Sequence, residues 1–286
     1  MSNVDRRSGL TMESFYDEYV KPNKPVIITD AADNWSALSK FTPEFFKTNF
    51  PDKKSTIKGK DYSLFEYIDI MHSSTVDAPG PYPFKVELTE NFQEVLQDVS
   101  PGFEILRKNR LDSPLFSSRI IPLASTLELF FGGPGGWFPY IHYDLYGMYA
   151  IVTQVFGSKE FTLWAPDQAK YLYVSKEDPW ISTIENYHEA DFNKYPEFKN
   201  AKSSTVTVNP GETIFVPLGY WHTARSMEAS ISIAQDLLSS YNWNVLRRDA
   251  VFYTKKESKT KGEILDIYIR LVGAAMSIHE KIVRSY

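Results

Sequence analysis

Hydrophobic and polar positions divide the chain into stretches of different periodicity, beginning with a mixed N-terminal stretch. Residues 13–20 carry an apolar stripe at helical spacing, which predicts a short helix. Residues 24–29 are typical of a strand, because a β-branched run follows a proline and is bounded by polar residues. Thr42-Pro43 indicates a second helix start, and residues 64–71 a third helix. We therefore expect a helix–strand region over residues 1–120.

The middle of the chain changes to short apolar runs separated by glycine and proline. Closely spaced short strands favour a sandwich or barrel over alternating strand–helix units. Helical periodicity returns after Tyr241, with apolar residues recurring at spacings of three and four. We expect a mainly β protein with flanking helices, composed of a β core at residues 121–240 and a C-terminal helical segment at residues 241–286. The predicted strands include residues 126–131, 149–156, 160–164, 204–208, 213–217 and 229–234.

Composition narrows the possible chemistry. The 286 residues are 43% hydrophobic and 15% aromatic, which is enough to bury a substantial core. The absence of cysteine excludes disulfides, cysteine-ligated zinc, iron–sulfur clusters and thiol nucleophiles. A metal ion must then be held by the five histidines, by carboxylates or by backbone oxygens. The net charge of −5 argues against general binding to nucleic-acid phosphates.

Signals for a membrane or for export are missing from the sequence. No uninterrupted run of about 18 apolar residues is present, so no transmembrane helix is predicted. The first residues lack the basic and then apolar layout of a secretion signal. The expected location is therefore cytoplasmic, without a membrane partner.

Two stretches that are almost free of charge contain the candidate site. Residues 129–158 have one formally charged side chain, Asp144, and His142 precedes it by two positions. Side chains at i and i+2 of a strand project from the same face, so this imidazole and this carboxylate converge. Residues 213–224 contain no charged residue, and there His222 follows a Pro/Gly turn. A lone carboxylate in apolar surroundings is costly unless it is paired or binds a metal.

Together, His142, Asp144 and His222 offer two imidazoles and one carboxylate. On one face of a metal ion this set leaves three adjacent positions open, as in the facial triad of non-haem iron(II) oxygenases. A 2-oxo acid occupies two of these positions and dioxygen the third. The alternative for each histidine is a hydrogen-bonded core residue, and a His-X-Asp triplet also arises by chance. Their order, separation and β-rich surroundings favour the metal site.

At these residues the sequence resembles the JmjC and cupin-like 2-oxoglutarate oxygenases. The resemblance is greatest to the small hydroxylase branch typified by the asparaginyl hydroxylase of hypoxia-inducible factor. It implies a double-stranded β-helix core (a jelly roll or cupin fold), Fe(II) as the metal, 2-oxoglutarate as co-substrate and O2 as oxidant. The matching segments are residues 15–35, 139–144, 154–161, 165–168 and 209–222.

Position by position, the resemblance implies His142, Asp144 and His222 as Fe(II) ligands. Lys159 falls where this branch places the lysine that binds the distal carboxylate of 2-oxoglutarate. The alternative for Lys159 is a solvent-facing lysine at a hairpin tip. Gln235 falls where the branch has an asparagine near the iron, and it is either a co-substrate contact or a plain strand residue.

The sequence departs from the family at Pro139, where a threonine or serine commonly gives the co-substrate an extra hydrogen bond. Tyr140, Thr153 and Gln154 are the candidates to supply that bond. Because of this departure, we do not infer the identity of the substrate from the family.

The resulting prediction is a 2-oxoglutarate-dependent dioxygenase that hydroxylates an unactivated C–H bond and releases succinate and CO2. By family analogy we expect a peptide or protein side chain as substrate. The alternatives are a hydroxylase of a small molecule or saccharide, a lysine demethylase, and a metal-binding cupin without oxygenase activity. Demethylation is disfavoured because no zinc-finger cysteine pattern or histone-reader module accompanies the domain.

Two further features concern partners. Residues 255–261 are basic and would suit nucleic acid, but a solvated loop before the last helix is the preferred interpretation in an acidic chain. The C-terminal amphipathic helix has more apolar surface than a lid requires, which predicts a homodimer interface.

Overall fold

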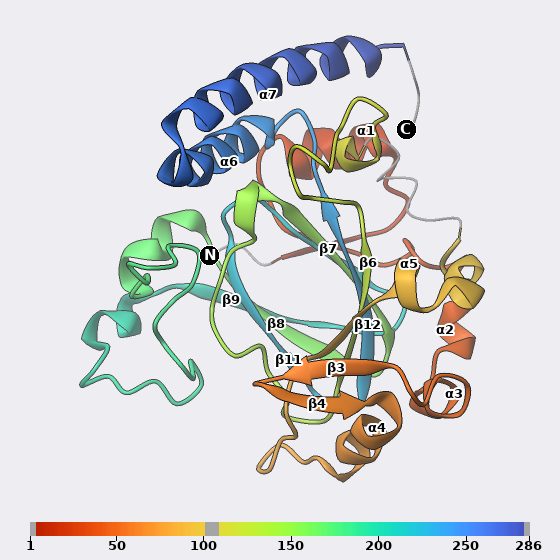
Figure 1. The fold of residues 1–286 in the computed structure, drawn as a ribbon. Coiled ribbons are helices and arrows are strands. Elements are labelled where there is room, and N and C mark those ends of the chain that lie inside the picture. Colours follow the sequence, from red (N-terminus) through yellow and green to blue (C-terminus); the bar gives the residue numbers. More distant parts are fainter. Residues whose placement is uncertain (1–3, 101–108, 283–286) are drawn as a thin grey trace.

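The computed structural model describes residues 4–100 and 109–282, whose strands form two main sheets (Figure 1). In the larger sheet, β7 (Tyr149–Phe156) lies between β10 (Thr213–Val216) and β12 (Ser230–Leu237). This sheet is completed by β1 (Asp5–Arg7) and β2 (Val26–Ile28) beyond β10, and by β6 (Leu127–Gly132) and β5 (Phe84–Glu87) beyond β12. The smaller sheet has the order β11 (Trp221–Ser226), β8 (Lys159–Trp164) and β9 (Ser203–Val208).

The two sheets pack against each other. Apolar side chains from both form one buried cluster that includes Ile214 of β10, Leu163 of β8 and Val208 of β9. The chain passes from the larger sheet to the smaller one at Gly157-Ser158, between β7 and β8. This jelly-roll arrangement confirms the predicted β core. The hairpin tip considered at this place is wrong, because β7 and β8 belong to different sheets.

Helices of the N-terminal region pack on the larger sheet. As predicted, α3 (Pro43–Asn49) begins after Thr42, whose hydroxyl accepts a hydrogen bond from the backbone N–H of Phe45 at 3.1 Å. Phe46 on this helix packs edge-to-face against Phe131 of β6, with ring centroids 5.0 Å apart. The other helical segments of this region are α1 (Met12–Phe15), the π-helical η1 (Tyr16–Val20), α2 (Ala37–Lys40), α4 (Leu64–Ser73), α5 (Leu88–Asn91) and the 3-10 turns η2 (Gln93–Val99) and η4 (Arg110–Asp112).

The N-terminal region also contributes strands. β1, β2 and β5 are part of the same sheet as the core strands, and one buried cluster contains residues of both regions. A separate ribbon of β3 (Lys54–Ile57) and β4 (Lys60–Ser63) precedes α4. The N-terminal region and the β core therefore share a sheet, and the boundaries of the three sequence-based regions remain predictions.

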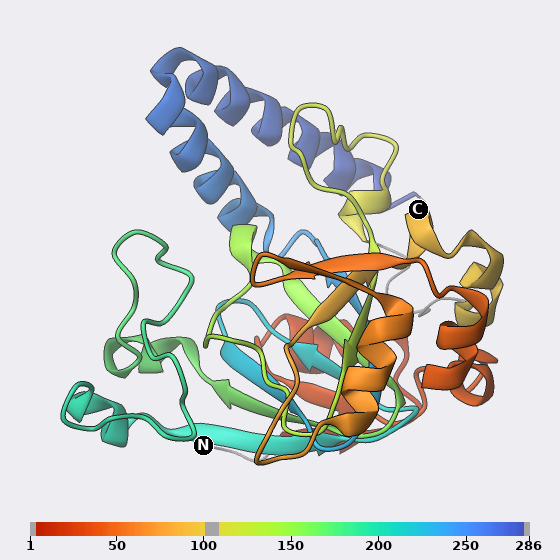
Figure 2. The same ribbon diagram turned by 60° about the horizontal axis from the view of Figure 1, so that its bottom comes forward.

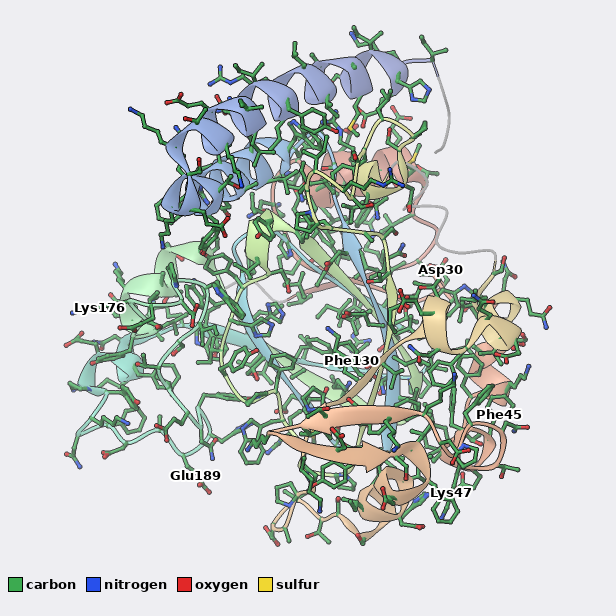
Figure 3. All side chains as sticks on the ribbon, in the orientation of Figure 1. Asp30, Phe45, Lys47, Phe130, Lys176 and Glu189 are labelled. Carbon is green, nitrogen blue, oxygen red and sulfur yellow. The ribbon has the colours of Figure 1, made fainter. Side chains whose placement is uncertain are left out.

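Between β8 and β9 the chain makes an excursion over residues 165–202, which includes η6 (Pro166–Tyr171) and η7 (Pro196–Asn200). Figure 3 places Lys176 and Glu189 of this excursion at the periphery, whereas Phe130 of β6 lies among the core strands. The inner part of the excursion is tied to the segment before β7, since the backbone N–H of Tyr143 donates to the carbonyl of Trp180 at 3.1 Å. The excursion therefore covers the chain that carries His142.

The C-terminal segment folds into a helical hairpin of α6 (Trp243–Glu257) and α7 (Lys259–His279), which projects beside the sheets (Figure 2). The indole N–H of Trp243 donates to the carbonyl of Ile269 at 3.1 Å, and a Cβ at Gly273 would overlap this indole. The basic residues 255–261 belong mainly to the adjoining ends of the two helices rather than to a separate loop. No helix in the described part of the chain has the length and apolar character needed to cross a membrane.

Candidate metal centre

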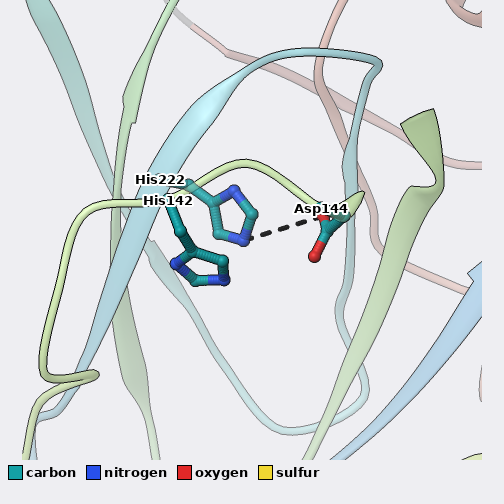
Figure 4. A group of neighbouring side chains, drawn as sticks. All are labelled: His142, Asp144 and His222. Carbon is teal, nitrogen blue, oxygen red and sulfur yellow. Dashed lines mark ion pairs between the residues drawn. The ribbon is translucent and has the colours of Figure 1, made fainter. Parts of the chain in front are cut away.

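His142 and His222 are neighbours across a short antiparallel bridge. The backbone N–H of His142 donates to the carbonyl of His222 at 3.0 Å, and the reverse bond measures 2.7 Å. Their ring centroids lie 4.3 Å apart on the same side of this bridge (Figure 4). His222 belongs to β11, a strand that the sequence analysis missed because a Pro/Gly turn directly precedes it. Backbone hydrogen bonds thus hold His142 and His222 side by side, although they are distant in sequence.

Asp144 completes the group from the start of a sharp turn, η5 (Leu145–Gly147). Its Oδ2 lies 3.9 Å from Nε2 of His222, and potential ligand atoms of all three residues lie within 4.8 Å of one another (Figure 4). The turn needs positive φ angles at Tyr146 (57°) and Gly147 (66°). The structure therefore brings the three predicted ligands together.

Each of the two imidazoles has a ring nitrogen lone pair available for a metal ion. Nδ1 of His222 lies 3.1 Å from the carbonyl oxygen of Tyr220. That contact places the proton on Nδ1, so Nε2 keeps its lone pair on the side of Asp144. Nδ1 of His142 is buried and has no hydrogen-bond partner within the described structure. The other ring nitrogen of His142, Nε2, lies on the side of Asp144 (Figure 4), where a metal ion would bind.

Electrostatics at the triad also favour a cation. Burial lowers the pKa of His222 to about 4, and burial together with the neighbouring His222 lowers the pKa of His142 well below 6.5. Both rings are therefore neutral at neutral pH. Burial, followed by the charge of Glu128, raises the pKa of Asp144 to about 7. A divalent ion stabilises the ionised carboxylate and accepts lone pairs of neutral imidazoles, so the three residues fit a 2-His-1-carboxylate iron(II) site.

The triad lines a cavity of about 160 Å³ that also contains Lys159. The Lys159 side chain is buried, and its Nζ donates to Ser232 Oγ at 2.6 Å and to Tyr82 Oη at 3.3 Å. None of the ion pairs in the described structure involves Lys159, and burial lowers its pKa to about 7. The solvent-facing alternative for Lys159 is therefore wrong. A buried amine between two hydroxyl groups is suited to bind an anionic group in the cavity.

The remaining cavity wall combines apolar rings with a few charges. Phe138 stacks on the His142 ring, with centroids 4.5 Å apart and planes 21° apart. Lys85 and Glu128 form an ion pair of 2.6 Å, and Asp236 lies on the same wall. The apolar part of the lining consists of Phe130, Phe138, Ala150, Val152, Phe161, Ala224 and Ala234.

Thr153 and Gln235 do not line this cavity. Thr153 Oγ1 pairs with Thr213 Oγ1 at 2.9 Å, and Gln235 Nε2 donates to Ser125 Oγ at 3.0 Å. Neighbouring residues of the same strands, such as Val152 and Ala234, do line it. Because side chains alternate between the faces of a strand, Thr153 and Gln235 point to the opposite face. This corrects the expectation that they contact a co-substrate there.

Tyr140 lies beside the triad but does not line the cavity. Its ring meets the His142 ring edge-on, with centroids 5.4 Å apart, and it packs against Trp180 of the excursion at 6.0 Å. Gln154 is fully buried, and its Nε2 donates to the carbonyl of Phe156 at 2.7 Å. A co-substrate role for Tyr140 remains a prediction.

Sequence analysis missed Tyr82 and Ser232, the two hydroxyl neighbours of Lys159. The alternation of Ser232, Ala234 and Asp236 along β12 was a usable signal, since small and polar residues occupy every second position. Tyr82 had no such signal, because it lies in a proline-rich segment without periodicity.

A jelly roll whose two sheets enclose an open 2-His-1-carboxylate group defines the structural class of the metal-binding cupins. Residues 12–244 match the cupin-like domain, so the chain belongs to that family.

Curated proteins with similar sequences include two named demethylases. Lysine-specific demethylase 8 of Danio rerio is 25% identical over 239 residues, which cover 78% of this chain and 55% of that protein. Arginine-specific demethylase JMJ20 of Arabidopsis thaliana is 25% identical over 287 residues, covering 87% and 61% respectively. HSPB1-associated protein 1 of Homo sapiens is 28% identical over 155 residues, covering 53% and 28%. The chain thus spans about half the length of the first relatives it matches.

Proposed function

We propose that this chain is an Fe(II)- and 2-oxoglutarate-dependent dioxygenase that hydroxylates an unactivated C–H bond of a peptide or protein side chain. Succinate and CO2 are the co-products. The observation that carries the proposal is the presence of Lys159 in the same cavity as the open triad. A triad alone would suit a metal-binding cupin of another activity. Burying a lysine without a carboxylate partner costs free energy, and an anion that binds in the cavity would offset this cost.

The cavity lining offers a polar group for each end of 2-oxoglutarate. His142, Asp144 and His222 would hold Fe(II), which when bound supplies adjacent sites for the 2-oxo acid and for O2. Lys159 would pair with the distal carboxylate in a charge-assisted contact, assisted by the Tyr82 hydroxyl. The incoming carboxylate raises the pKa of Lys159 again, because an opposite charge favours the ammonium form.

The surrounding side chains orient the ligands and exclude water. Phe138 stacks on His142 and restrains the plane of its ring. The Tyr220 carbonyl selects the His222 tautomer that presents Nε2. Phe130 and Phe161 cover the apolar wall, which shields the reacting C–H bond from solvent.

Three observations support a peptide or protein side chain as the substrate. The cavity wall holds two carboxylates beyond the triad, Glu128 and Asp236, and Lys85 pairs with the first. This surplus of acceptors favours a substrate group that donates hydrogen bonds, such as an amide, amine or guanidinium. The relatives named as lysine- and arginine-specific demethylases point to protein side chains. The resemblance to the small asparaginyl hydroxylase branch points the same way.

Demethylation of lysine or arginine is the second candidate, and the names of the relatives favour it. The first chemical step is the same, because hydroxylation of an N-methyl C–H bond gives a hemiaminal. That product breaks its C–N bond and releases formaldehyde and the free amine. The two candidates therefore differ in the substrate and not in the roles of the cavity residues.

Succinate release in the presence of Fe(II), ascorbate and 2-oxoglutarate tests the proposal. A panel of unmodified and N-methylated peptides is then analysed by mass spectrometry. Gain of one oxygen indicates hydroxylation, and loss of a methyl group with formaldehyde indicates demethylation. Asp144→Ala should remove metal binding and succinate release together, Lys159→Ala should mainly weaken 2-oxoglutarate binding, and the exposed Lys176→Ala is the control. Metal binding without any binding of 2-oxoglutarate would favour the non-oxygenase cupin and contradict the proposal.

A further inference from the structure

A second cavity lies in the C-terminal hairpin, apart from the metal centre. It has a volume of about 270 Å³ and lies between the first residues of α6 and the second half of α7, in the hairpin that Figure 2 shows. None of the residues that line it also lines the cavity of the triad. The described part of the chain places no carboxylate on its wall but three arginines, Arg110, Arg247 and Arg270. Such a wall attracts anions.

Arg110 reaches the cavity from the core. Its side chain is 1% exposed, which is rare for arginine, and its guanidinium lies over the Trp243 ring at 5.0 Å. Its Nε and Nη2 donate to the carboxylate of Glu280, and Nη2 also donates to Ser277 Oγ at 2.9 Å. The third nitrogen, Nη1, has no hydrogen-bond partner among the described residues. These contacts hold the guanidinium in place and leave donors available to a ligand.

Arg247 of α6 and Arg270 of α7 share one carboxylate, that of Asp266. The shortest nitrogen–oxygen distance is 3.6 Å for Arg247 and 3.0 Å for Arg270. At 3.6 Å the Arg247 guanidinium makes no hydrogen bond to Asp266, so its donors are available as well. Since Arg110 pairs with Glu280, the three guanidinium groups have two carboxylate partners in the described structure. These groups therefore carry a surplus positive charge, although the whole chain has a net charge of −5.

The start of α6 adds backbone donors to the same wall, at Trp243 and Asn244. Asn242 stands at the N-cap position but does not cap the helix, because its side chain bonds to the carbonyl of Gly147 and the backbone N–H of Ser239. The first turn of α6 also lacks an acidic side chain. An uncapped start of a 15-residue helix attracts an anion through its N–H groups and its dipole.

We propose that this cavity binds a small phosphate monoester, whose phosphate group contacts Arg247, Arg270 and the start of α6. Each guanidinium presents two parallel N–H groups that match two phosphate oxygens, and a dianionic phosphate uses more donors and more positive charge than a carboxylate. The hydroxyl of Ser240 adds a further donor. A volume of about 270 Å³ lies at the lower end of the range for ligand pockets, roughly 300 Å³ and above, which favours a small molecule over a nucleotide.

The site joins segments that are distant in sequence. A ligand in the cavity would contact η4, the start of α6 and the second half of α7 together. Because this arrangement exists only in the folded chain, the ligand should raise the free energy of unfolding. Binding requires neither the metal nor 2-oxoglutarate, so it can be measured on the metal-free protein.

Calorimetric titration of the metal-free full chain tests the site with three probes, glycerol 3-phosphate, inorganic phosphate and acetate. We expect one glycerol 3-phosphate per chain, bound at least as tightly as inorganic phosphate. Acetate should bind roughly 10-fold more weakly or worse, because it has one negative charge and two oxygens. Equal affinity for acetate and glycerol 3-phosphate would overturn the assignment to a phosphate, and no binding of glycerol 3-phosphate at millimolar concentration would overturn the site.

Arginine variants locate the binding. Arg247→Ala and Arg270→Ala should each weaken glycerol 3-phosphate binding roughly 10-fold or more, with an unchanged far-UV circular dichroism spectrum, because each removes a charge-assisted contact. Arg248→Ala is the matched control, since Arg248 is on the same helix, is 67% exposed and does not line the cavity. Native affinity in both Arg247→Ala and Arg270→Ala would overturn the proposal.

Lys159→Met separates this site from the cavity of the triad, which also offers a cation to anions. We expect this variant to bind glycerol 3-phosphate with native affinity. A large loss in Lys159→Met, with native affinity in the arginine variants, would place the phosphate beside the triad and overturn the hairpin site. Failure of the hairpin site in this way would leave the proposed oxygenase activity untouched, since that activity depends on other residues.

Discussion

Replacing Lys159 by methionine removes the buried amine and keeps most of the length and volume of the side chain. The Lys159 side chain is 2% exposed, and burial lowers its pKa from 10.5 to about 7. A change of one pKa unit corresponds to about 1.36 kcal/mol. Burial of the Lys159 amine therefore lowers the free energy of unfolding of the ligand-free protein by roughly 4 kcal/mol at pH 7. Since methionine has no such penalty, Lys159→Met should stabilise the ligand-free fold by roughly 2–4 kcal/mol.

The penalty depends on pH with a definite sign. The pKa of Lys159 in the folded state lies below its unfolded value of 10.5, so the unfolded chain binds more protons between about pH 7 and 10.5. The penalty is fully present below about pH 7 and disappears above about pH 10.5. The stability of the native chain should therefore rise across this window relative to Lys159→Met. Urea denaturation of the ligand-free proteins at about pH 6, 8 and 10 measures this difference.

Lys159→Met should also strongly weaken the binding of 2-oxoglutarate. A buried carboxylate that loses its cationic partner costs about 3–5 kcal/mol, which corresponds to a loss of affinity of roughly 10²- to 4 × 10³-fold. Calorimetric titration of the metal-loaded protein with 2-oxoglutarate measures it, and metal affinity should remain within a few fold. Lys176→Met, at an exposed lysine, should change neither quantity. Native-like affinity of Lys159→Met for 2-oxoglutarate would refute the assigned role.

Two further predictions concern the triad and the crossing between the sheets. Asp144→Asn should abolish metal binding and preserve the circular dichroism spectrum, because the amide keeps the shape of the carboxylate without its charge. Elemental analysis that still finds one metal ion per chain would contradict this prediction. Gly157→Ala should destabilise the fold by at least about 2 kcal/mol in urea denaturation, because φ is +62° and a Cβ would overlap the carbonyl oxygen of Ala229. Gly9 also has a positive φ, +64°, but no atom lies within 4 Å of the position that a Cβ would take there. Gly9→Ala therefore measures the cost of the positive φ alone, and an equal loss of stability in both variants would show that the contact with Ala229 costs nothing.

Local patterns in the sequence were sufficient for many elements. The predicted strand at residues 149–156 coincides with β7. The N-terminal cap at Thr42 and the helix at residues 64–71 follow from short-range hydrogen bonding and periodicity, which depend on neighbouring residues alone. The convergence of His142 and Asp144 was also accessible, because it follows from the geometry of a short extended segment.

Features that depend on strand register and on distant segments were not accessible. A shift of one residue exchanges the faces of a strand, and β12 has an irregular register between Ile231 and Ser232. The family resemblance implied that Gln235 lies near the iron, whereas Asp236, one residue further along β12, is the residue that lines the cavity. Tyr82 reaches Lys159 through a contact between segments 77 residues apart, for which the sequence contains no local pattern.

Asn242, which directly precedes α6, connects the C-terminal hairpin to the turn that follows Asp144. This residue is fully buried, and its Nδ2 donates to the carbonyl of Gly147 at 2.8 Å, at the end of the turn that begins with Asp144. The Asn242 Oδ1 accepts from the backbone N–H of Ser239 at 2.7 Å. Asn242→Ala leaves these buried partners unsatisfied, which should cost about 2–4 kcal/mol of folding stability.

The substitution should also act on the metal, because a displaced turn moves the Asp144 carboxylate away from the two imidazoles. We expect Asn242→Ala to weaken metal binding by about 10-fold or more, as is usual when a group that orients a ligand is lost. Metal titration and urea denaturation separate the two effects, and Asn244→Ala, at an exposed residue in the first turn of α6, is the control. If Asn242→Ala loses stability but binds metal with native affinity, the hairpin supports the fold without positioning Asp144.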